Sequence, residues 1–371
     1  MTTASFEGLA DEWDDLALRT GAAPFARPGW VRAWWSAFGR GELRILTSRR
    51  DGELSSVLPL ARVRGGLRSC SNVHFPVFDG VCLEPEDLQI LLTAALRESR
   101  QGLVLSQLDS EGQLVAATRQ AADQNRCRLV VLDATASPFV DTTLSWEEFE
   151  QSLTKSRRND VRRRRRRLAE QGEISHEITD GTEDLEAHLS EFFRLEGSGW
   201  KADKGTAIHL LPETRRFYEE IAAWAANRGL LRLSIMRLDG RPVAVEFTID
   251  DGVRRYLLKM GYDPEYARYG PGLLLQLGEI RHALEDGRTY ELGVGMNAIK
   301  EEMGSAQRTI EHVAVFPRSA RGTLARRTVE ARQAVYRKAR GSTLLRRGRD
   351  AVRRRLTRRR ASSPDTTPAP D

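Results

Sequence analysis

A glycine-rich turn leads directly into an amphipathic helix at residues 266–287, YARYGPGLLLQLGEIRHALEDG. Pro271 is of the type that favours the first turn of a helix, and it stands between Gly270 and Gly272. Leucine and isoleucine then recur at helical spacing and form one apolar face. The first turn of such a helix has unpaired backbone N–H groups, and glycines allow a phosphate to approach them. The segment therefore predicts either a plain turn or an anion site. The predicted elements before and after it are needed to distinguish the two.

Three predicted strands precede this helix and one follows it, which is not the order of the common nucleotide-binding motifs. The strands are expected at 230–238, 241–250, 254–263 and 289–295. The strand 241–250 alternates apolar and polar residues along its whole length, which is typical of a strand with two different faces. The patterns GxxxxGK[ST] and GxGxxG are both absent, so a P-loop and a dinucleotide fingerprint are excluded.

The whole chain has 371 residues, which is enough for two domains. Helices and strands of mixed α/β character follow a similar order in its two halves. We expect a first half at 1–140, a second half at 146–317, a basic helical tail at 318–360 and a disordered, proline-rich end at 361–371. Residues 134–145 are expected to form the linker between the halves.

Basic residues are concentrated in two segments. Residues 318–360 hold 17 Lys and Arg and two acidic residues, a net charge of +15, whereas the rest of the chain has a net charge of −9. Residues 162–167 are six consecutive arginines inside a helix expected at 146–171. At about 100° per residue, these arginines surround the helix. Both segments favour contact with a polyanion, such as the phosphates of CoA, an RNA or an anionic membrane surface, and solvated basic helices are the alternative.

The three cysteines match neither an even disulfide framework nor a metal-ligand spacing, so we expect reduced thiols and no bound metal. The acidic N-terminal stretch is unlike a signal peptide, and no apolar run approaches the roughly 18 residues of a membrane span. A cytoplasmic protein is expected, with the tail at 318–360 as a means of holding it at the inner face of the membrane.

Several segments, taken in order, resemble a known group of enzymes. ARYGPG is similar to the [QR]xxGx[GA] loop of the GNAT superfamily of N-acyltransferases, shortened by one residue. Further blocks resemble the CelD or BioF-like acetyltransferase family, a FemAB-like group: PGWVRAWWSAFG (28–39), VLPLARV (57–63), EGSGWKADKGTAI (196–208), GYDPEYARYGPGLLL (261–275) and YELGVGMNAIK (290–300).

This resemblance covers roughly residues 5–316. It implies an α/β fold with mixed sheets, made of tandem GNAT-like domains of which the second carries the CoA-type loop. The implied activity is transfer of an acyl group from acetyl-CoA or another acyl-CoA to an amine acceptor, as in cell-envelope or polysaccharide biosynthesis. FemAB-like relatives imply an alternative in which aminoacyl-tRNA is the donor. A third interpretation is a non-catalytic scaffold at a membrane-bound synthesis complex.

Direct acyl transfer needs a bound thioester, a hydrogen-bond donor to its carbonyl and a base for the amine proton. Glu246 is the first predicted base and Glu291 the second, and Tyr262 is a predicted proton donor to the leaving thiolate. The residues expected to bind CoA lie in or beside the glycine turn: Arg268, Tyr269, Gly270, Gly272 and Leu273. The residues expected to bind the acceptor are Trp200, Lys201, Lys259 and Lys300.

Overall fold

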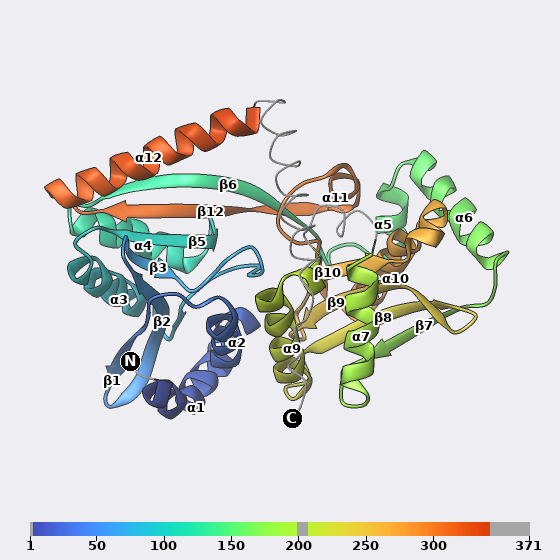
Figure 1. Ribbon diagram of the computed structural model, residues 1–371, viewed down its shortest axis with the longest axis horizontal. Helices are drawn as coiled ribbons and strands as arrows, with labels where there is room; N and C mark the ends of the chain where they lie inside the picture. Colours follow the sequence, from blue (N-terminus) through green and yellow to red (C-terminus); the bar gives the residue numbers. More distant parts are fainter. Residues whose placement is uncertain (1–2, 199–206, 342–371) are drawn as a thin grey trace, which may run out of the picture.

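The computed structural model describes residues 3–198 and 207–341. A single mixed sheet of twelve strands runs through both described parts (Figure 1). Its strands follow the spatial order β1-β2-β3-β5-β12-β6-β11-β10-β9-β8-β7, and β4 pairs with β2 at the side. The strands are β1 (Glu42–Arg50), β2 (Glu53–Val63), β3 (Gly66–Ser69), β4 (Val81–Cys82), β5 (Leu103–Asp109), β6 (Arg128–Val140), β7 (Ile174–Thr179), β8 (Leu231–Leu238), β9 (Arg241–Asp250), β10 (Arg254–Tyr262), β11 (Thr289–Glu291) and β12 (Ala306–Phe316).

Helices cover this sheet along its length, and short 3₁₀ turns precede α2, α9 and α10 (Figure 1). The 3₁₀ turns are η1 (Pro24–Ala26), η2 (Ile208–Leu210) and η3 (Pro264–Tyr269). The helices are α1 (Thr3–Arg19), α2 (Pro28–Phe38), α3 (Pro85–Glu98), α4 (Gln113–Gln124), α5 (Trp146–Ser152), α6 (Lys155–Ala169), α7 (Leu185–Glu196), α9 (Pro212–Ala226), α10 (Pro271–Glu285), α11 (Ala298–Met303) and α12 (Ala320–Gly341). Among the helices in this part of the chain, none combines the length and the apolar character needed to cross a membrane.

Strand β9 shows how alternating residues build two layers on the sheet. The ring of Phe247 packs against Phe192 of α7 and Tyr218 of α9, at centroid distances of 5.3 and 5.5 Å. Glu246, the neighbouring residue, points to the opposite face, where the hydroxyl of Tyr290 donates a hydrogen bond to it and α10 packs on β9. Because successive side chains of a strand point to opposite faces, α7 and α9 cover one side and α10 the other.

The two halves of the chain exchange strands at the centre of the sheet. β12, the last strand of the second half, pairs with β5 and β6 of the first half, and β6 in turn pairs with β11 of the second. The mixed α/β fold is therefore confirmed, but one sheet passes through both halves. The boundaries at 140 and 146 stay a prediction made from the sequence.

An aromatic cluster and an ion-pair network join the halves on the side of α2 and α9. The indole of Trp30 is fully buried and lies edge-on to Phe217 and Trp224 of the second half, at 5.5 and 6.3 Å. Nearby, the Asp14 carboxylate accepts two hydrogen bonds from the Arg27 guanidinium, at 2.7 and 2.8 Å, and forms an ion pair with Arg228. Both Asp14 and Arg27 are buried, so this network is part of the core.

Three predictions about the elements are wrong. Residues 134–145 are largely strand rather than linker, because β6 continues to Val140 as the partner of β12. The helix expected at 146–171 is divided into α5 and α6, and Thr154 caps the second by accepting a hydrogen bond from the Arg157 N–H. The predicted strand 289–295 ends at Glu291. Within the predicted tail, Ala320–Gly341 form helix α12, and the rest of the tail lies outside the described residues.

Candidate functional site

The parallel strands β10 and β11 part shortly after they begin to pair. Their ladder runs from Arg254 opposite Thr289 to Tyr256 opposite Glu291. The chain beyond β11 then follows β6, because the Leu292 N–H donates to the Pro138 carbonyl and the Gly295 N–H to that of Ala136. β10 itself continues to Tyr262 beside β9, with a shift of register at Leu257 to Lys259. Beyond Tyr256 no ladder joins β10 to β11 in the described chain, and we call the place where the two strands diverge the opening.

The N-terminus of α10 stands beside this opening. Gly270 adopts a left-handed conformation, with φ of 64°, immediately before Pro271 begins the helix. A Cβ atom on Gly272 would lie 3.2 Å from the Met260 side chain and 3.3 Å from the Tyr262 ring, so the helix starts in close contact with β10. The partial positive charge of a helix N-terminus is thus placed next to the part of β10 that lies beyond its ladder with β11.

The arginine-rich helix α6 reaches the same glycine turn. Nη1 of Arg164 donates a hydrogen bond to the Arg268 carbonyl at 3.3 Å, and it would lie 2.9 Å from a Cβ atom on Gly270. Asp160, one turn earlier in α6, accepts a 2.7 Å hydrogen bond from Nε of Arg164 and holds the side chain in this direction. The arginine run therefore supplies a cation to the turn. The sequence showed the run, but it did not show that α6 packs against η3.

Lys300 lies where the chain leaves β11. Its Nζ donates to the Gly293 carbonyl at 2.8 Å and approaches that of Val294 at 3.4 Å. The Asn297 side chain caps α11 by accepting from the Lys300 N–H, which fixes the position of this residue. A Cβ atom on Gly293 would lie 3.3 Å from the Leu257 carbonyl of β10, so Lys300 is anchored close to the point where the strands part. Burial lowers its pKa to about 8.

Glu246, the first predicted base, is completely buried under α10. Tyr290 donates a 2.7 Å hydrogen bond to its Oε2, and its Oε1 has no partner in the described part of the chain. Burial raises the pKa of Glu246 to about 8, and the nearby Glu279 carboxylate adds to the rise. A carboxyl group with no exposed surface cannot meet an amine acceptor in this arrangement. The structure therefore argues against the predicted role, because the polar face of β9 is directed at α10 and not at solvent.

The second predicted base, Glu291, is held between two arginines. Its Oε1 accepts hydrogen bonds from Arg254 at 2.9 Å and from Arg308. Burial raises the pKa of Glu291, although both guanidinium groups oppose the rise. The position of Glu291 at the end of the paired segment agrees with a place near the opening, and its role as a base stays a prediction.

The other predicted residues lie on β10 or near the glycine turn, except for two that are outside the described residues. Tyr262 ends β10, and its carbonyl accepts from the Ser198 hydroxyl at 2.7 Å, while the Arg268 guanidinium lies 4.7 Å from the centre of the Tyr269 ring. Lys259 lies near His74 of the first half: burial lowers the pKa of His74 to about 3, and the positive charge of Lys259 contributes. Leu273 packs in the apolar cluster that includes Leu257 and Leu292. Trp200 and Lys201 lie outside the described residues.

A protein-family model matches the part of the chain that carries these residues. Residues 155–301 match the family described as acetyltransferase (GNAT) domain, and these residues include α6, β10, α10, β11 and Lys300. The search of the curated proteins gave no match.

Solved structures resemble nearly the whole chain at low sequence identity. The C-terminal domain of a putative lysylphosphatidylglycerol synthetase from Agrobacterium fabrum superimposes with a TM-score of 0.55 and 14% identity, covering 88% of this chain and 96% of that one. FemX gives a TM-score of 0.56 and 13% identity, covering 82% and 95%. A conserved protein of unknown function from Bacteroides thetaiotaomicron gives 0.53 and 12%, covering 85% and 97%. Residues 155–301 are thus similar to a GNAT acetyltransferase domain, and the chain as a whole has a fold similar to that of FemX and of the lysylphosphatidylglycerol synthetase domain.

Proposed function

We propose that the protein transfers an acyl group from an acyl-CoA to an amine. The observation that carries this proposal is the opening between β10 and β11, with the N-terminus of α10 beside it. A pantetheine arm needs an extended strand edge with which it can pair, and a pyrophosphate needs backbone N–H groups and positive charge. The part of β10 beyond its ladder with β11 would supply the edge, and the turn at Gly270 with Arg164 and Arg268 would supply the charge.

In the proposed reaction, the amine nitrogen forms a bond to the thioester carbonyl carbon, the carbon–sulfur bond breaks, and CoA leaves as a thiolate that takes up a proton. The amine must lose a proton as it attacks. Lys300 is the group that we assign to this transfer, because a buried lysine with a pKa of about 8 exchanges protons readily near neutral pH. Tyr262 remains the predicted donor to the thiolate. No step requires a covalent enzyme intermediate.

Replacing Arg164 with glutamine should weaken CoA binding by about 10- to 100-fold, the value of one charge-assisted hydrogen bond to a phosphate. Arg163 is the matched control, because it also pairs with Asp160 but its side chain is 55% exposed. Arg163→Gln should change the Kd less than about threefold. Isothermal titration of acetyl-CoA into the wild type and both variants measures this. Equal weakening in the two variants would remove the glycine turn from the proposed site.

Aminoacyl-tRNA is the second donor that we consider, because most arginines of the run in α6 are exposed and α12 adds a second basic helix. Binding of tRNA would weaken steeply as the salt concentration rises. Thermal unfolding with bulk tRNA and with acetyl-CoA, each at 50 and 200 mM salt, separates the two donors. Stabilisation by tRNA alone would favour the aminoacyl donor, and stabilisation by neither would favour the scaffold.

The tail at 318–360 is proposed to contact an anionic membrane surface, where each basic residue adds about 1 kcal/mol. An acceptor embedded in or attached to the cell envelope would then lie within reach of the active site. This part of the proposal rests on the net charge of the segment, +15.

A further inference from the structure

A cavity of about 600 Å³ runs along α10 beyond its N-terminal turn. It is bounded by α5 and α6 on one side and by β7 and β8 on the other. Its floor is apolar and is formed by Leu153, Val161, Ile174, Met236, Leu274 and Leu277. Its rim carries more basic than acidic groups and is formed by Arg158, Arg162, Arg165, Arg281, His176, His282, Glu150 and Glu285. We call this cavity the α10 groove.

Two positive charges of the rim are not balanced by carboxylates. Arg162 and Arg281 have partners in Glu150, at 3.7 Å, and Glu285, at 2.7 Å. Arg158, in contrast, donates to backbone carbonyls at the end of α5, with both the Gln151 and the Leu153 oxygen at 2.7 Å, and to no carboxylate in the described chain.

Arg165 makes no hydrogen bond or ion pair with any residue in the described part of the chain, and its charge acts on the ring of His176. Together with Arg158 it gives the α10 groove two unneutralised guanidinium groups. An anionic group is therefore the natural partner of the rim.

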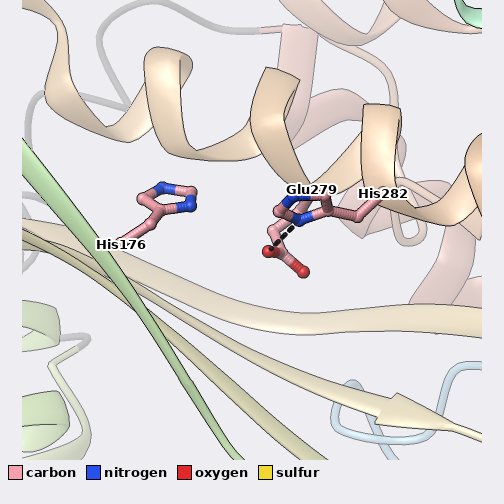
Figure 2. Close-up of side chains that lie close together, drawn as sticks. All are labelled: His176, Glu279 and His282. Atoms are coloured by element: carbon pink, nitrogen blue, oxygen red, sulfur yellow. Dashed lines mark hydrogen bonds and ion pairs between the residues drawn. The ribbon is translucent and has the colours of Figure 1, made fainter.

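The histidines of the rim belong to a cluster that resembles a metal site. His176 of β7 points toward α10, from which Glu279 and His282 project (Figure 2). However, the Glu279 carboxylate already accepts two hydrogen bonds from the Arg232 guanidinium, at 2.7 and 3.3 Å. Burial opposes ionisation of Glu279, but His282 and Arg232 outweigh it and lower its pKa to about 2.

A cation placed between the two imidazoles would lie close to Arg232 and Arg165, which both act electrostatically on His176. The only acidic member of the cluster is committed to Arg232. The cluster therefore suits an anion better than a metal ion, because the imidazoles can donate hydrogen bonds to an anion and become protonated beside it.

We propose that the α10 groove binds an amphiphile with one apolar chain and a phosphate head. The chain would lie on the apolar floor, and the phosphate would be bound by Arg165, His176 and Arg158. From Leu274 to Glu285 the groove follows α10 for roughly 16 Å, at about 1.5 Å per residue, and its volume falls in the range of about 300–1,000 Å³ that is usual for small ligands. A lipid with two long chains would exceed it. The proposal is independent of the acyl donor.

Gly278 offers a direct way to close the groove. It lines the cavity in the middle of α10, and a Cβ atom there would lie 3.1 Å from the exposed ring of His176. Leucine at this position favours the helix more than glycine does, so Gly278→Leu fills the floor without weakening α10. We expect this variant to lose binding of the amphiphile at least 10-fold while its Tm stays equal or rises.

Decyl phosphate, below its micelle concentration, is the probe, measured by isothermal titration with the full chain. Arg165→Glu should weaken binding at least 10-fold. Arg166→Glu makes the same change of charge one residue further on, at a side chain that is 73% exposed and faces Glu170, and should weaken binding less than twofold.

Three further titrations distinguish the other occupants. Inorganic phosphate that binds as tightly as decyl phosphate would overturn the role of the apolar floor. Decyltrimethylammonium that binds equally well would overturn the role of the basic rim. If Zn²⁺ binds at micromolar concentration and this binding is lost in His176→Ala, while decyl phosphate does not bind, the cluster is a metal site and the proposal is wrong. Binding of decyl phosphate that survives in Gly278→Leu would place the ligand elsewhere.

Discussion

Replacing Lys300 with methionine is expected to lower the kcat for acyl transfer by about 100-fold or more, the range found for general acid–base groups. The reason is its position: Nζ is fixed 2.8 Å from the Gly293 carbonyl at the place where β10 and β11 part. Lys155→Met is the matched control, because it removes the same charge from an exposed position at the start of α6. Single-turnover rates with acetyl-CoA and an amine acceptor measure the effect, and circular dichroism verifies the fold.

The pH profile tests whether Lys300 moves a proton or only carries a charge. Only the neutral amine can accept the proton of the acceptor, so the rate should rise with pH and level off above about pH 8, where burial places the pKa of Lys300. Arginine stays protonated throughout this range. Lys300→Arg should therefore be as slow as Lys300→Met. An active Lys300→Arg enzyme would mean that the positive charge, and not proton transfer, is what this position supplies.

Replacing Asp14 with alanine is expected to reduce the free energy of unfolding by about 3–5 kcal/mol, the cost of leaving a buried charge without its partner. Arg27 is 6% exposed and would lose both hydrogen bonds to Asp14, and Arg228 of the second half would lose its ion pair. Urea unfolding followed by tryptophan fluorescence measures the change.

Asp15 is the control for this experiment, because it is adjacent, 68% exposed and paired only with Arg19 in the described chain. Asp15→Ala should cost less than about 1 kcal/mol, as surface ion pairs do. If the two variants were equally stable, the Asp14 network would contribute nothing to holding α1 against the second half.

Local patterns were sufficient to predict most of the elements. Pro28 and Pro271 begin α2 and α10 as expected, and the alternation in residues 241–250 gives the bounds of β9. The sequence could not reveal the length of β6, because its end, Ala-Thr-Ala-Ser-Pro, has neither strong alternation nor β-branched runs. Residues 134–140 are extended because β12 and β11 pair with them, and such distant pairing leaves no local signal.

The site was only partly predictable for a similar reason. The glycine turn and Lys300 were singled out from the order of the segments, and in the structure the turn contacts the end of β10 at Tyr262 whereas Lys300 bonds to Gly293, beside Leu257. Glu246 was chosen because it lies on the polar face of its strand, but periodicity shows that two faces differ without showing which one faces solvent. Arg164 could not be singled out among six identical neighbours, since its role depends on how α6 packs against η3.

The exchange of β6 and β12 also decides when the protein can fold during its synthesis. The first half is translated first but lacks the strand that lies between β5 and β6, and this strand, Ala306–Phe316, is translated only at the end of the second half. Until it arrives, two long strands have unpaired edges, which are templates for aggregation. The exposed edges of β5 and β6 must therefore be kept from pairing with other chains until almost all of the sheet has been translated. A chain released from a ribosome that stalls before residue 306 would lack β12, and its sheet would remain open between β5 and β6.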